Sequence, residues 1–401
     1  VVASMVPLSA TLKRRFKTRS LFICAISFFI LGVILDGVAP AFWVLLLGRG
    51  IQGLGTGIAL PLMFNIILEQ VPASKIGMMM GVGTIITGGA PAIGPTFGGI
   101  VVSALNWRYI FAFLLPILVV ALILGLICIQ QKTPTAKASI DRLSVGLIVV
   151  TFCGLIFGIS SWGSQPFASW SVAGALVVGI IALIGFTRRS LRITQPIINL
   201  RLFANRGFTT CVLAFVCLQI SALGLSFVLP NYIQLVNGNT ALIAGLLVLP
   251  GSALGAIVGP LSGRLFDHIG AKLPLRLGGL VGALGLLGLF LFGHQLSDPL
   301  LVLMYCFFML GLGLSYGNLM TFGLGHLAPE ASSDGNAIYN TLQQFAAAVG
   351  TSVAAALVAA GQAATHNLAT GTANGSVTTF ALLTILLVCE FIFVVRVTRA
   401  K

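Results

Sequence analysis

Long apolar runs separated by short polar breaks dominate the pattern of this chain. A helix needs roughly 17 to 25 apolar residues to cross about 30 Å of hydrocarbon, and twelve runs reach that length. They cover residues 21–38, 42–67, 77–105, 107–129, 144–162, 170–187, 207–235, 241–262, 277–293, 300–322, 337–360 and 376–397. Residues 1–12 are also apolar but would extend only about 18 Å as a helix, and position 1 is not Met. We therefore expect the chain to begin in the middle of a helix.

The polar breaks are basic on one side of these runs. If residues 13–19 face the cytoplasm, 20 of the 22 Lys and Arg residues fall on that side, with Arg108 outside and Arg49 within a run. Such segregation is the usual orientation signal of membrane proteins, and it places the C-terminus in the cytoplasm. The net charge of +14 then serves topology and contact with anionic membrane lipid, so we expect no nucleic-acid partner.

The composition agrees with an all-α polytopic protein of the cell membrane. Hydrophobic residues make up 58% of the 401 positions and charged residues 7%, whereas about 25% charged is usual in soluble domains. The runs hold one deep carboxylate and no histidine, which disfavours the paired acids or activated nucleophile of an intramembrane enzyme. No Cys and His cluster has metal-ligand spacing. We therefore expect no enzyme, no metal and no cofactor.

Two long basic segments, 130–143 and 188–206, bracket a pair of apolar runs and divide the chain into three parts. We expect an N-terminal bundle over 1–131, an inserted helix pair with its basic loops over 132–206, and a C-terminal bundle over 207–401. If one helix and the start of a second come before residue 1, the plan is two six-helix bundles with an inserted two-helix hairpin. Two such halves favour a transporter with a site between them.

A short repeat supports the two-half plan. PLSATLKRRFKTR at 7–19 and PLSGRLFDHIGAK at 260–272 share Pro-Leu-Ser at the same offset from a basic tail. In the second copy, the lone carboxylate of Asp267 stands among cations, where it can cap a helix start or pair with an arginine of a neighbouring span. We predict a gate at the cytoplasmic mouth, the alternative being a plain salt-bridged loop. The gate residues are Gly263, Arg264, Asp267, Gly270 and Lys272.

Residues 88–99, GGAPAIGPTFGG, would form a loop in water but lie inside an apolar run. Within a membrane the protein must satisfy its own backbone polar groups, so we interpret this segment as a helix whose glycines admit a neighbouring backbone. Its two prolines bend it locally, and helical spacing gives it an almost side-chain-free edge. The positions that define this predicted hinge are Gly94, Pro95, Gly98 and Gly99.

Arg49 lies within an apolar run, about 10 Å below the external surface. A charge at that depth costs a few kcal/mol, so Arg49 should face a partner or a water-filled cavity, and Gln52 and Thr56 share its helix face. We predict a buried positive charge that borders an ion or substrate path, the alternative being an arginine that snorkels outward. Asp36, at the external end of its run, is interpreted as a solvated terminus.

Polar side chains form stripes on the runs of the C-terminal half. One stripe comprises Gln219, Ser226, Pro230 and Gln234, another comprises Asn336, Asn340, Gln343 and Gln344, and Tyr316 and Asn318 add polar groups between them. Each such residue could serve only as interhelical glue worth about 1 kcal/mol. Taken together, the stripes favour a central cavity. We predict that a substrate cavity is lined by Gln219, Gln234, Asn318, Asn340 and Gln343.

Glu390 is the only acidic residue deep in a complete run. A protonatable carboxyl at that depth can carry a proton. However, Glu390 lies in the last run and six residues before Arg396, so a structural carboxyl that is neutral or snorkels inward is the alternative.

With these pieces assembled, the chain resembles the fourteen-span drug:proton antiporters of the major facilitator superfamily over essentially its whole length. GGAPAIGPTFGG is similar to the antiporter motif of that family, and LLLGRGIQGLGTG is similar to its fourth-helix motif, whose arginine corresponds to Arg49. NWRYIFAFLLP at 106–116 resembles the start of the sixth helix, and GRLFDHIGAK resembles the signature loop between the second and third helices of a half. The chain looks most similar to lincomycin-resistance and multidrug exporters.

This resemblance implies a major facilitator fold in which two bundles rock and expose a central cavity to each side in turn. It implies that the proton gradient drives export of a small lipophilic substrate, with proton coupling at Arg49 and Gln52. The glycine-rich fifth helix would close one bundle against the other, and the protein is expected to be a monomer. A proton-coupled symporter or a metabolite exporter on the same scaffold is the alternative.

Two departures from the family pattern matter. In the first-half loop, Ala10 and Arg14 stand where the family has glycine and aspartate, so a latch there has lost its carboxylate. The first helix of the family, which carries a membrane-embedded acidic residue, is missing from the chain, as is part of the second. A nonfunctional truncated transporter is therefore a further alternative.

Overall fold

Eleven long apolar helices dominate the computed structural model of the protein. The structure describes residues 1–84, 94, 97–98, 101–102, 104–131, 141–162, 165, 169–193 and 196–399. Within these residues, eleven helices are long and apolar enough to cross a membrane. They confirm eleven of the twelve predicted runs. The remaining run, 77–105, falls mostly outside the described residues, and helix α5 (Ile76–Thr84) covers its start.

The helices fall into three sets along the chain. The N-terminal set comprises α1 (Val2–Met5), α2 (Ser9–Arg15), α3 (Thr18–Gly37), α4 (Phe42–Gln70), α5 and α7 (Arg108–Cys128). The inserted hairpin comprises α8 (Arg142–Trp162) and α9 (Ala175–Arg192), the latter preceded by a π-helical turn, η4 (Trp170–Gly174). The C-terminal set comprises α10 (Arg206–Leu235), α11 (Ala241–Ile269), α12 (Lys272–Leu291), α13 (Asp298–Leu324), α14 (Ser332–Ala363) and α15 (Leu368–Arg399).

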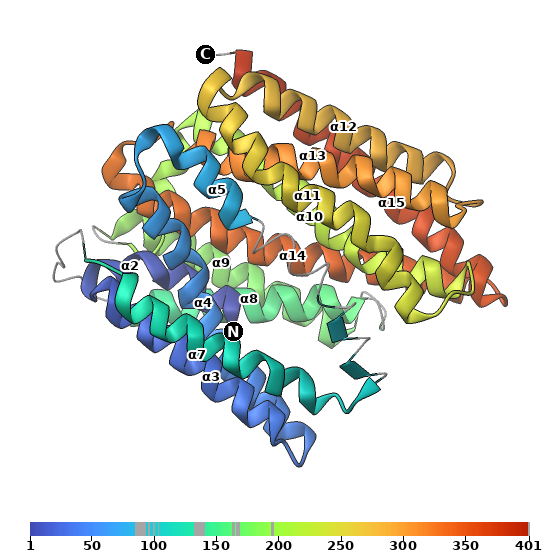
Figure 1. Cartoon of the computed structure of the whole chain (residues 1–401), viewed down its shortest axis with the longest axis horizontal. Helices are drawn as coiled ribbons and strands as arrows, with labels where there is room; N and C mark the ends of the chain where they lie inside the picture. The colour runs from blue at the N-terminus through green and yellow to red at the C-terminus, as the bar shows by residue number, and fades with distance from the viewer. Residues whose placement is uncertain are drawn as a thin grey trace.

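Each set packs mainly within itself. Helix α3 lies along α4 and α7, while α10 to α15 form a separate layer beside them (Figure 1). The hairpin helices α8 and α9 pack on each other, and α8 also packs on α14. Contact between the N-terminal and C-terminal sets comes from α5 against α11 and α13, and from α4 and the short helices α1, η1 (Val6–Leu8) and α2 against α14. Any site between the two sets therefore lies beside α4, α5, α11 and α14.

The largest apolar core lies in the C-terminal set. Phe208, Phe215 and Tyr339 are at most 1% exposed, and the ring of Tyr339 meets both phenylalanines edge to face, at centroid distances of 5.7 and 5.1 Å. Such aromatic pairs contribute about 0.5 to 1.5 kcal/mol each beyond their buried area. This core fixes α10, α13 and α14 relative to one another.

An ion pair joins the two helices of the hairpin at their basic ends. Nε and Nη2 of Arg189 donate to the two carboxylate oxygens of Asp141 at 2.6 and 2.9 Å. The hydrogen bonds from Arg189 hold the pKa of Asp141 well below its ordinary value. Since the paired form of Asp141 is the ionised one, this contact is present at neutral pH and is lost only in strong acid.

Candidate functional site

A buried carboxylate lies near the end of α3, beside α4. The Asp36 side chain is fully buried, and its Oδ2 accepts a 2.8 Å hydrogen bond from Nε2 of Gln52. Nε of Arg49 lies 3.4 Å from the same oxygen, and Nη1 of Arg49 donates to Oε1 of Gln52 at 3.3 Å. These three side chains form one charged cluster, which we call the carboxylate triad.

Glycines make the burial of Asp36 possible. Gly48 lies against the Asp36 carboxyl, and a Cβ added at Gly32 would lie 2.6 Å from the carbonyl oxygen of Gly48. Because α3 and α4 approach this closely, water is displaced from Asp36, and its interpretation as a solvated terminus is wrong. Within the described part of the chain, Oδ1 of Asp36 has no hydrogen-bond partner. One carboxylate oxygen is thus held by the triad, while the other packs against Gly48.

Arg49 bridges the buried carboxylate and open space. Its guanidinium carbon lies 5.3 Å from the ring centroid of Phe111 on α7, a distance at which a cation is attracted to the ring face. The Arg49 side chain is 60% exposed, so the prediction of a buried positive charge is wrong: one side of the guanidinium faces outward while the other balances Asp36. The expected partner of Arg49 is therefore present, and its role in proton coupling stays a prediction.

Buried amides join α4 to α14. Nδ2 of Asn336 donates to Oδ1 of Asn65 at 2.8 Å and to the carbonyl oxygen of Pro61 at 3.1 Å. Nδ2 of Asn340 in turn donates to Oδ1 of Asn336 at 2.7 Å, and Oδ1 of Asn340 has no partner among the described residues. This amide bridge links the N-terminal and C-terminal sets and leaves one acceptor free for a ligand.

The other four predicted cavity residues lie in different settings. Asn318 donates to Oγ of Ser262 at 2.6 Å, which ties α13 to α11 within the C-terminal set. Gln234 donates to a carbonyl oxygen of its own helix, and Gln219 and Gln343 are each 6% exposed. The structure therefore brings Asn340 to the contact between the two sets and places Asn318 inside one of them. Substrate contact at all five positions stays a prediction.

Asp267, near the end of α11, meets the start of α5. Its Oδ1 accepts from the backbone N–H of Gly77 and its Oδ2 from that of Met78, both at 3.1 Å. These amides belong to the first turn of α5, where backbone N–H groups lack intrahelical partners and negative charge is favoured. Asp267 therefore caps a helix 190 residues away in the chain, as one of the two sequence interpretations predicts.

The neighbours of Asp267 complete this contact. Gly263 lies so close to Gly77 that any side chain at 263 would collide with the backbone of α5, and Nε of Arg264 lies 3.1 Å from a methionine sulfur of α5. Gly270 ends α11 with φ of 80°, a left-handed conformation that favours glycine. Lys272 is the first residue of α12. The predicted gate is thus a real contact between the two helix sets, and gating itself stays a prediction.

The N-terminal counterpart of this contact has its charges exchanged. Arg14 occupies the position of Asp267 in the sequence repeat, and its Nη2 lies 3.2 Å from Oδ1 of Asp334 in the first turn of α14. The first loop has lost its carboxylate, as the sequence indicates, but the contact is kept because the carboxylate comes from the facing helix. Each repeat loop therefore reaches the start of a helix in the opposite set.

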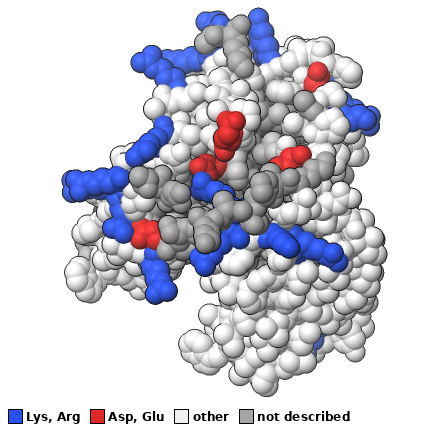
Figure 2. Space-filling view, turned by 90° about the vertical axis from the view of Figure 1, so that its left-hand side faces the viewer, with Lys and Arg blue, Asp and Glu red and all other residues white. Residues whose placement is uncertain are grey.

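These contacts surround a cavity of about 550 Å³ between the two helix sets. Asn65 of α4 and Asp267 and Thr321 of the C-terminal set line it, together with Lys13 and Glu69, which form an ion pair with each other. Figure 2 shows this end of the molecule, where blue Lys and Arg side chains surround a few red acidic ones. The cavity thus lies beside the predicted gate, and charged side chains form part of its lining.

The predicted hinge falls at the edge of the described residues. Pro95 and Gly99 lie outside them, so nothing is concluded about these two positions. Gly94 and Gly98 are described, and no described atom lies within 4 Å of a Cβ added at either. The hinge role of all four residues stays a prediction.

A close helix approach is seen instead at the start of the same run, on α5. A Cβ added at Gly81 would lie 2.6 Å from the carbonyl oxygen of Gly259 and 2.8 Å from Cα of Pro260. One added at Gly77 would lie 2.8 Å from the carbonyl oxygen of Gly263. Small residues allow such backbone contact between membrane helices. The run therefore does close against the C-terminal set, through glycines before residue 85.

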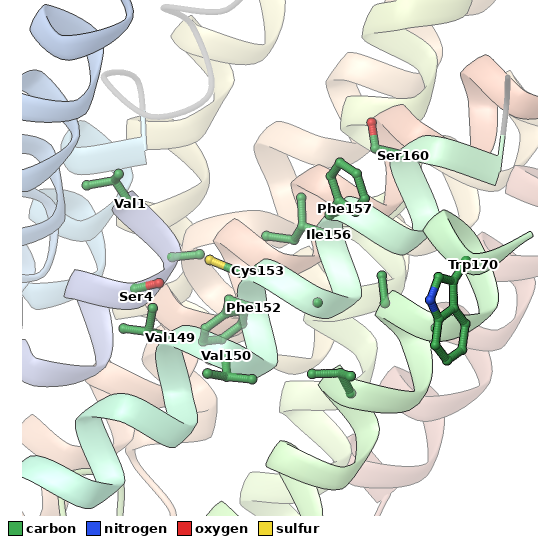
Figure 3. A pocket seen from close by; sticks show the side chains of 15 residues that line it. Val1, Ser4, Val149, Val150, Phe152, Cys153, Ile156, Phe157, Ser160 and Trp170 are labelled. Atoms are coloured by element: carbon green, nitrogen blue, oxygen red, sulfur yellow. The ribbon is translucent and has the colours of Figure 1, made fainter. Parts of the chain in front are cut away.

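An apolar pocket of about 930 Å³ lies between α1 and the hairpin (Figure 3). Phe152 and Phe157 of α8 line it, with Val1 on the far side. Its hydroxyl groups come only from Ser4 and Ser160. None of the five predicted cavity residues contributes to this pocket, whose lining suits a largely apolar ligand.

The fold and the contact between two helix sets define a polytopic membrane transporter, and comparison with known proteins supports this class. Residues 1–351 match the profile of the Major Facilitator Superfamily. The chain is 39% identical over 365 residues to the lincomycin resistance protein LmrB of Bacillus subtilis, covering 90% of this chain and 76% of that protein. It is 29% identical over 363 residues to a multidrug resistance protein B homolog of Mycobacterium tuberculosis, covering 89% and 67%. The chain therefore belongs to the Major Facilitator Superfamily, and it is a transporter and not an enzyme.

Solved structures support the same fold. The human organic anion transporter MFSD10 superposes with a TM-score of 0.61 at 16% identity, over 96% of this chain and 81% of that one. The proton:xylose symporter XylE superposes with a TM-score of 0.59 at 17% identity, over 96% and 82%. At such low identity the likeness concerns the fold alone. It confirms the all-α major facilitator architecture that the sequence predicts.

Proposed function

We propose that this protein is a proton-driven antiporter that exports small lipophilic molecules, drugs among them, across the cell membrane. The observation that carries the proposal is the carboxylate triad, in which a fully buried Asp36 is held by Arg49 and Gln52. Intramembrane carboxylates of this kind serve proton relays in transporters. Relatives named for lincomycin and multidrug resistance support drugs as the substrate class.

Proton binding at Asp36 would change the charge balance of the triad. In the ionised state, Oδ2 is held by Gln52 and Arg49, and Oδ1 is free to bind a proton. Protonation cancels the carboxylate charge and leaves the guanidinium without its counter-ion. Arg49 is already 60% exposed, so without the carboxylate charge its guanidinium is free to turn further toward its exposed side. Arg49 and Asn65 both belong to α4, and Asn65 accepts the hydrogen bond of the amide bridge from Asn336. A shift of α4 on protonation would therefore reach the contact between the two sets.

Alternating access would follow from making and breaking the contacts between the two sets. The caps that Asp267 places on α5 and the Arg14–Asp334 pair close the basic end of the molecule. When they separate, the cavity of about 550 Å³ opens to the side where the basic loops lie. We infer that this side is cytoplasmic, and that the C-terminus is on the same side because Thr398 near the end of α15 accepts a hydrogen bond from Arg276 near the start of α12.

A fourteen-span plan fits these contacts. In it, 1–131 and 207–401 are parts of the two bundles and 132–206 carries the inserted pair. We take the protein to work as a monomer in contact with anionic lipid. Few carboxylates lie in the spans, which argues against strong selection for dications, and the apolar pocket beside the hairpin fits lipophilic substrates.

Dye export tests the proposal. Cells that express the protein should accumulate less of a lipophilic fluorescent dye than cells with an empty vector, by about two- to tenfold, and a protonophore should abolish the difference. Unchanged accumulation over a panel of neutral, cationic and anionic dyes contradicts drug export. Proton flow in the direction of the substrate, measured on substrate addition to vesicles, would instead indicate a symporter.

Exchanging charges at the N-terminal contact should be largely reversible. Arg14→Glu places two carboxylates together, so we expect dye export to fall by about threefold, as suits a partly exposed pair worth about 0.2 to 1 kcal/mol and now repulsive. Adding Asp334→Arg restores the pair and should return more than half of the lost export. Arg15→Glu is the matched control, because it makes the same charge change one residue along. A double variant no better than Arg14→Glu alone contradicts the role given to this contact.

A further inference from the structure

Glu390 is a buried carboxyl that the proposed mechanism leaves unused. It lies on α15, about 14 Å along the helix from its last residue, and its side chain is fully buried. Within the described part of the chain, neither Oε1 nor Oε2 has a hydrogen-bond partner, and none of the ion pairs there includes Glu390. Buried polar groups are hydrogen-bonded in the great majority of cases, so this carboxyl needs an explanation.

The groups around Glu390 come from three helices. A Cβ added at Gly279 of α12 would lie 2.6 Å from Oε2, so the glycine leaves the space that the carboxyl occupies. The thiol of Cys217 on α10 interacts electrostatically with Glu390, and the thiol of Cys389 belongs to the preceding residue of α15. Phe391 packs on the same glycine. Among the described residues no cation forms an ion pair with the carboxyl in this conformation, and an unpaired carboxylate in such surroundings would cost several kcal/mol.

The nearest basic residue along the same seam is also incompletely satisfied. Arg276 precedes Gly279 by one turn of α12, and its Nε donates to Oγ1 of Thr398 on α15 at 2.9 Å. Its Nη2 is buried and has no hydrogen-bond partner among the described residues. Thr398 lies about two turns from Glu390 on the same face of α15. Because α12 and α15 run antiparallel, Arg276 and Gly279 follow the same face in the opposite direction. Arg276 lies one turn of α12 from Gly279, and Gly279 contacts the carboxyl, so the free cationic nitrogen and the free carboxyl belong to one helix interface.

We propose that Glu390 is a second proton-binding site, protonated in this conformation, whose deprotonated form is paired by Arg276. When the proton leaves to water, the guanidinium releases Thr398 and turns toward the carboxylate at Gly279. Only the proton leaves the protein. The hydrogen bond from Arg276 to Thr398 is replaced by an ion pair between Arg276 and Glu390, and both contacts join α12 to α15. The inference deepens the proposed antiport and rests on it for its role in transport, but the protonation state of Glu390 is testable on its own.

A hydrophobic fluorescent carbodiimide is a direct probe, because it reacts with protonated carboxyls in apolar surroundings. Purified protein that carries Asp36→Asn, which removes the other buried carboxyl of the triad, should be labelled in lipid nanodiscs at neutral pH. Adding Glu390→Gln, which keeps the shape of the protonated side chain, should reduce labelling at least about fivefold. Glu330→Gln is the matched control, since Glu330 lies at the exposed start of the α14 segment. Two results overturn the proposal. One is labelling that survives when Glu390→Gln is added, and the other is a midpoint below about pH 6 for the loss of labelling as the pH rises with Glu390 intact.

The role of Arg276 has its own readout. Because Arg276 stabilises the ionised carboxyl, Arg276→Gln should move the midpoint at which labelling is lost to higher pH by about one unit or more, whereas Arg276→Lys should restore most of the difference. An unmoved midpoint overturns the pairing. No step of this assay needs drug transport. Failure of dye export with normal labelling would therefore count against the proposed function alone.

Discussion

Asp36→Asn is expected to reduce gradient-driven export to the background, at least about tenfold below the wild type, because a buried proton site cannot be replaced by an amide that does not titrate. Asparagine has nearly the same shape and can still accept the hydrogen bond from Gln52. The protein should therefore remain folded and inserted. Everted vesicles with an acidic interior provide the measurement, as the rate of dye uptake that a protonophore abolishes, at matched protein levels.

The control for this experiment is an acidic residue outside the triad that accepts hydrogen bonds from two amides. Asp298, the first residue of α13, accepts hydrogen bonds from Asn237 at 2.6 Å and from Asn239 at 2.8 Å. Asp298→Asn removes the same charge outside the triad and should retain at least about half of the uptake. If Asp36→Asn keeps as much uptake as Asp298→Asn, the triad does not couple protons, whatever else it stabilises.

Gly81→Leu should be the second severe change, because α5 and α11 touch through their backbones. A Cβ at this position would already lie 2.6 Å from the carbonyl oxygen of Gly259, and a backbone cannot give way as a side chain can. Overpacking of a well-packed interface typically costs about 1 to 3 kcal/mol, and we expect a loss of export of at least about tenfold. Held apart, the two sets should also leave the cavity between them open.

Accessibility of that cavity separates this effect from simple misfolding. Thr321→Cys places a reporter thiol in the cavity lining, and its reaction with a membrane-impermeant maleimide should speed up in the Gly81→Leu background. Gly146→Leu is the matched control, since no described atom lies within 4 Å of a Cβ added at Gly146 of α8. A slower reaction in Gly81→Leu, or equal loss of export in Gly146→Leu, would contradict closure through α5.

The helices and the gate are predictable from sequence because their causes are local. An apolar run of sufficient length forms a helix in lipid, so eleven runs reappear as helices, although several of these helices extend up to about two turns beyond the predicted ends. Asp267 is a carboxylate isolated among cations, and a helix start is one of the few partners that suit it. Which helix it caps depends on the fold, and only the structure identifies α5.

The burial of Asp36 and the Arg14–Asp334 pair depend on distant residues. Asp36 stands at the end of an apolar run, where exposure is the ordinary outcome, and it is buried because Gly48 of the next helix has no side chain. Arg14 lies 320 positions before its partner in the chain. The amide bridge from Asn65 to Asn336 is likewise formed across the two sets. The sequence pattern identifies polar positions on each helix, but the pairs among them arise from tertiary packing.

The exchanged charges of the two repeat loops make the closed end mechanically uneven. On one side, the side chains of Arg14 and Asp334 are 42% and 14% exposed, so water weakens their attraction. Dissolved salt screens it further, with a screening length of about 10 Å at 0.1 M. On the other side, Asp267 binds backbone amides while Gly263 and Gly77 lie in contact, and neither interaction depends much on ionic strength. The first side is the weaker fastening and yields first. The two helix sets then separate first at the Arg14–Asp334 pair and rotate about the contact between α5 and α11. High salt should make this separation easier.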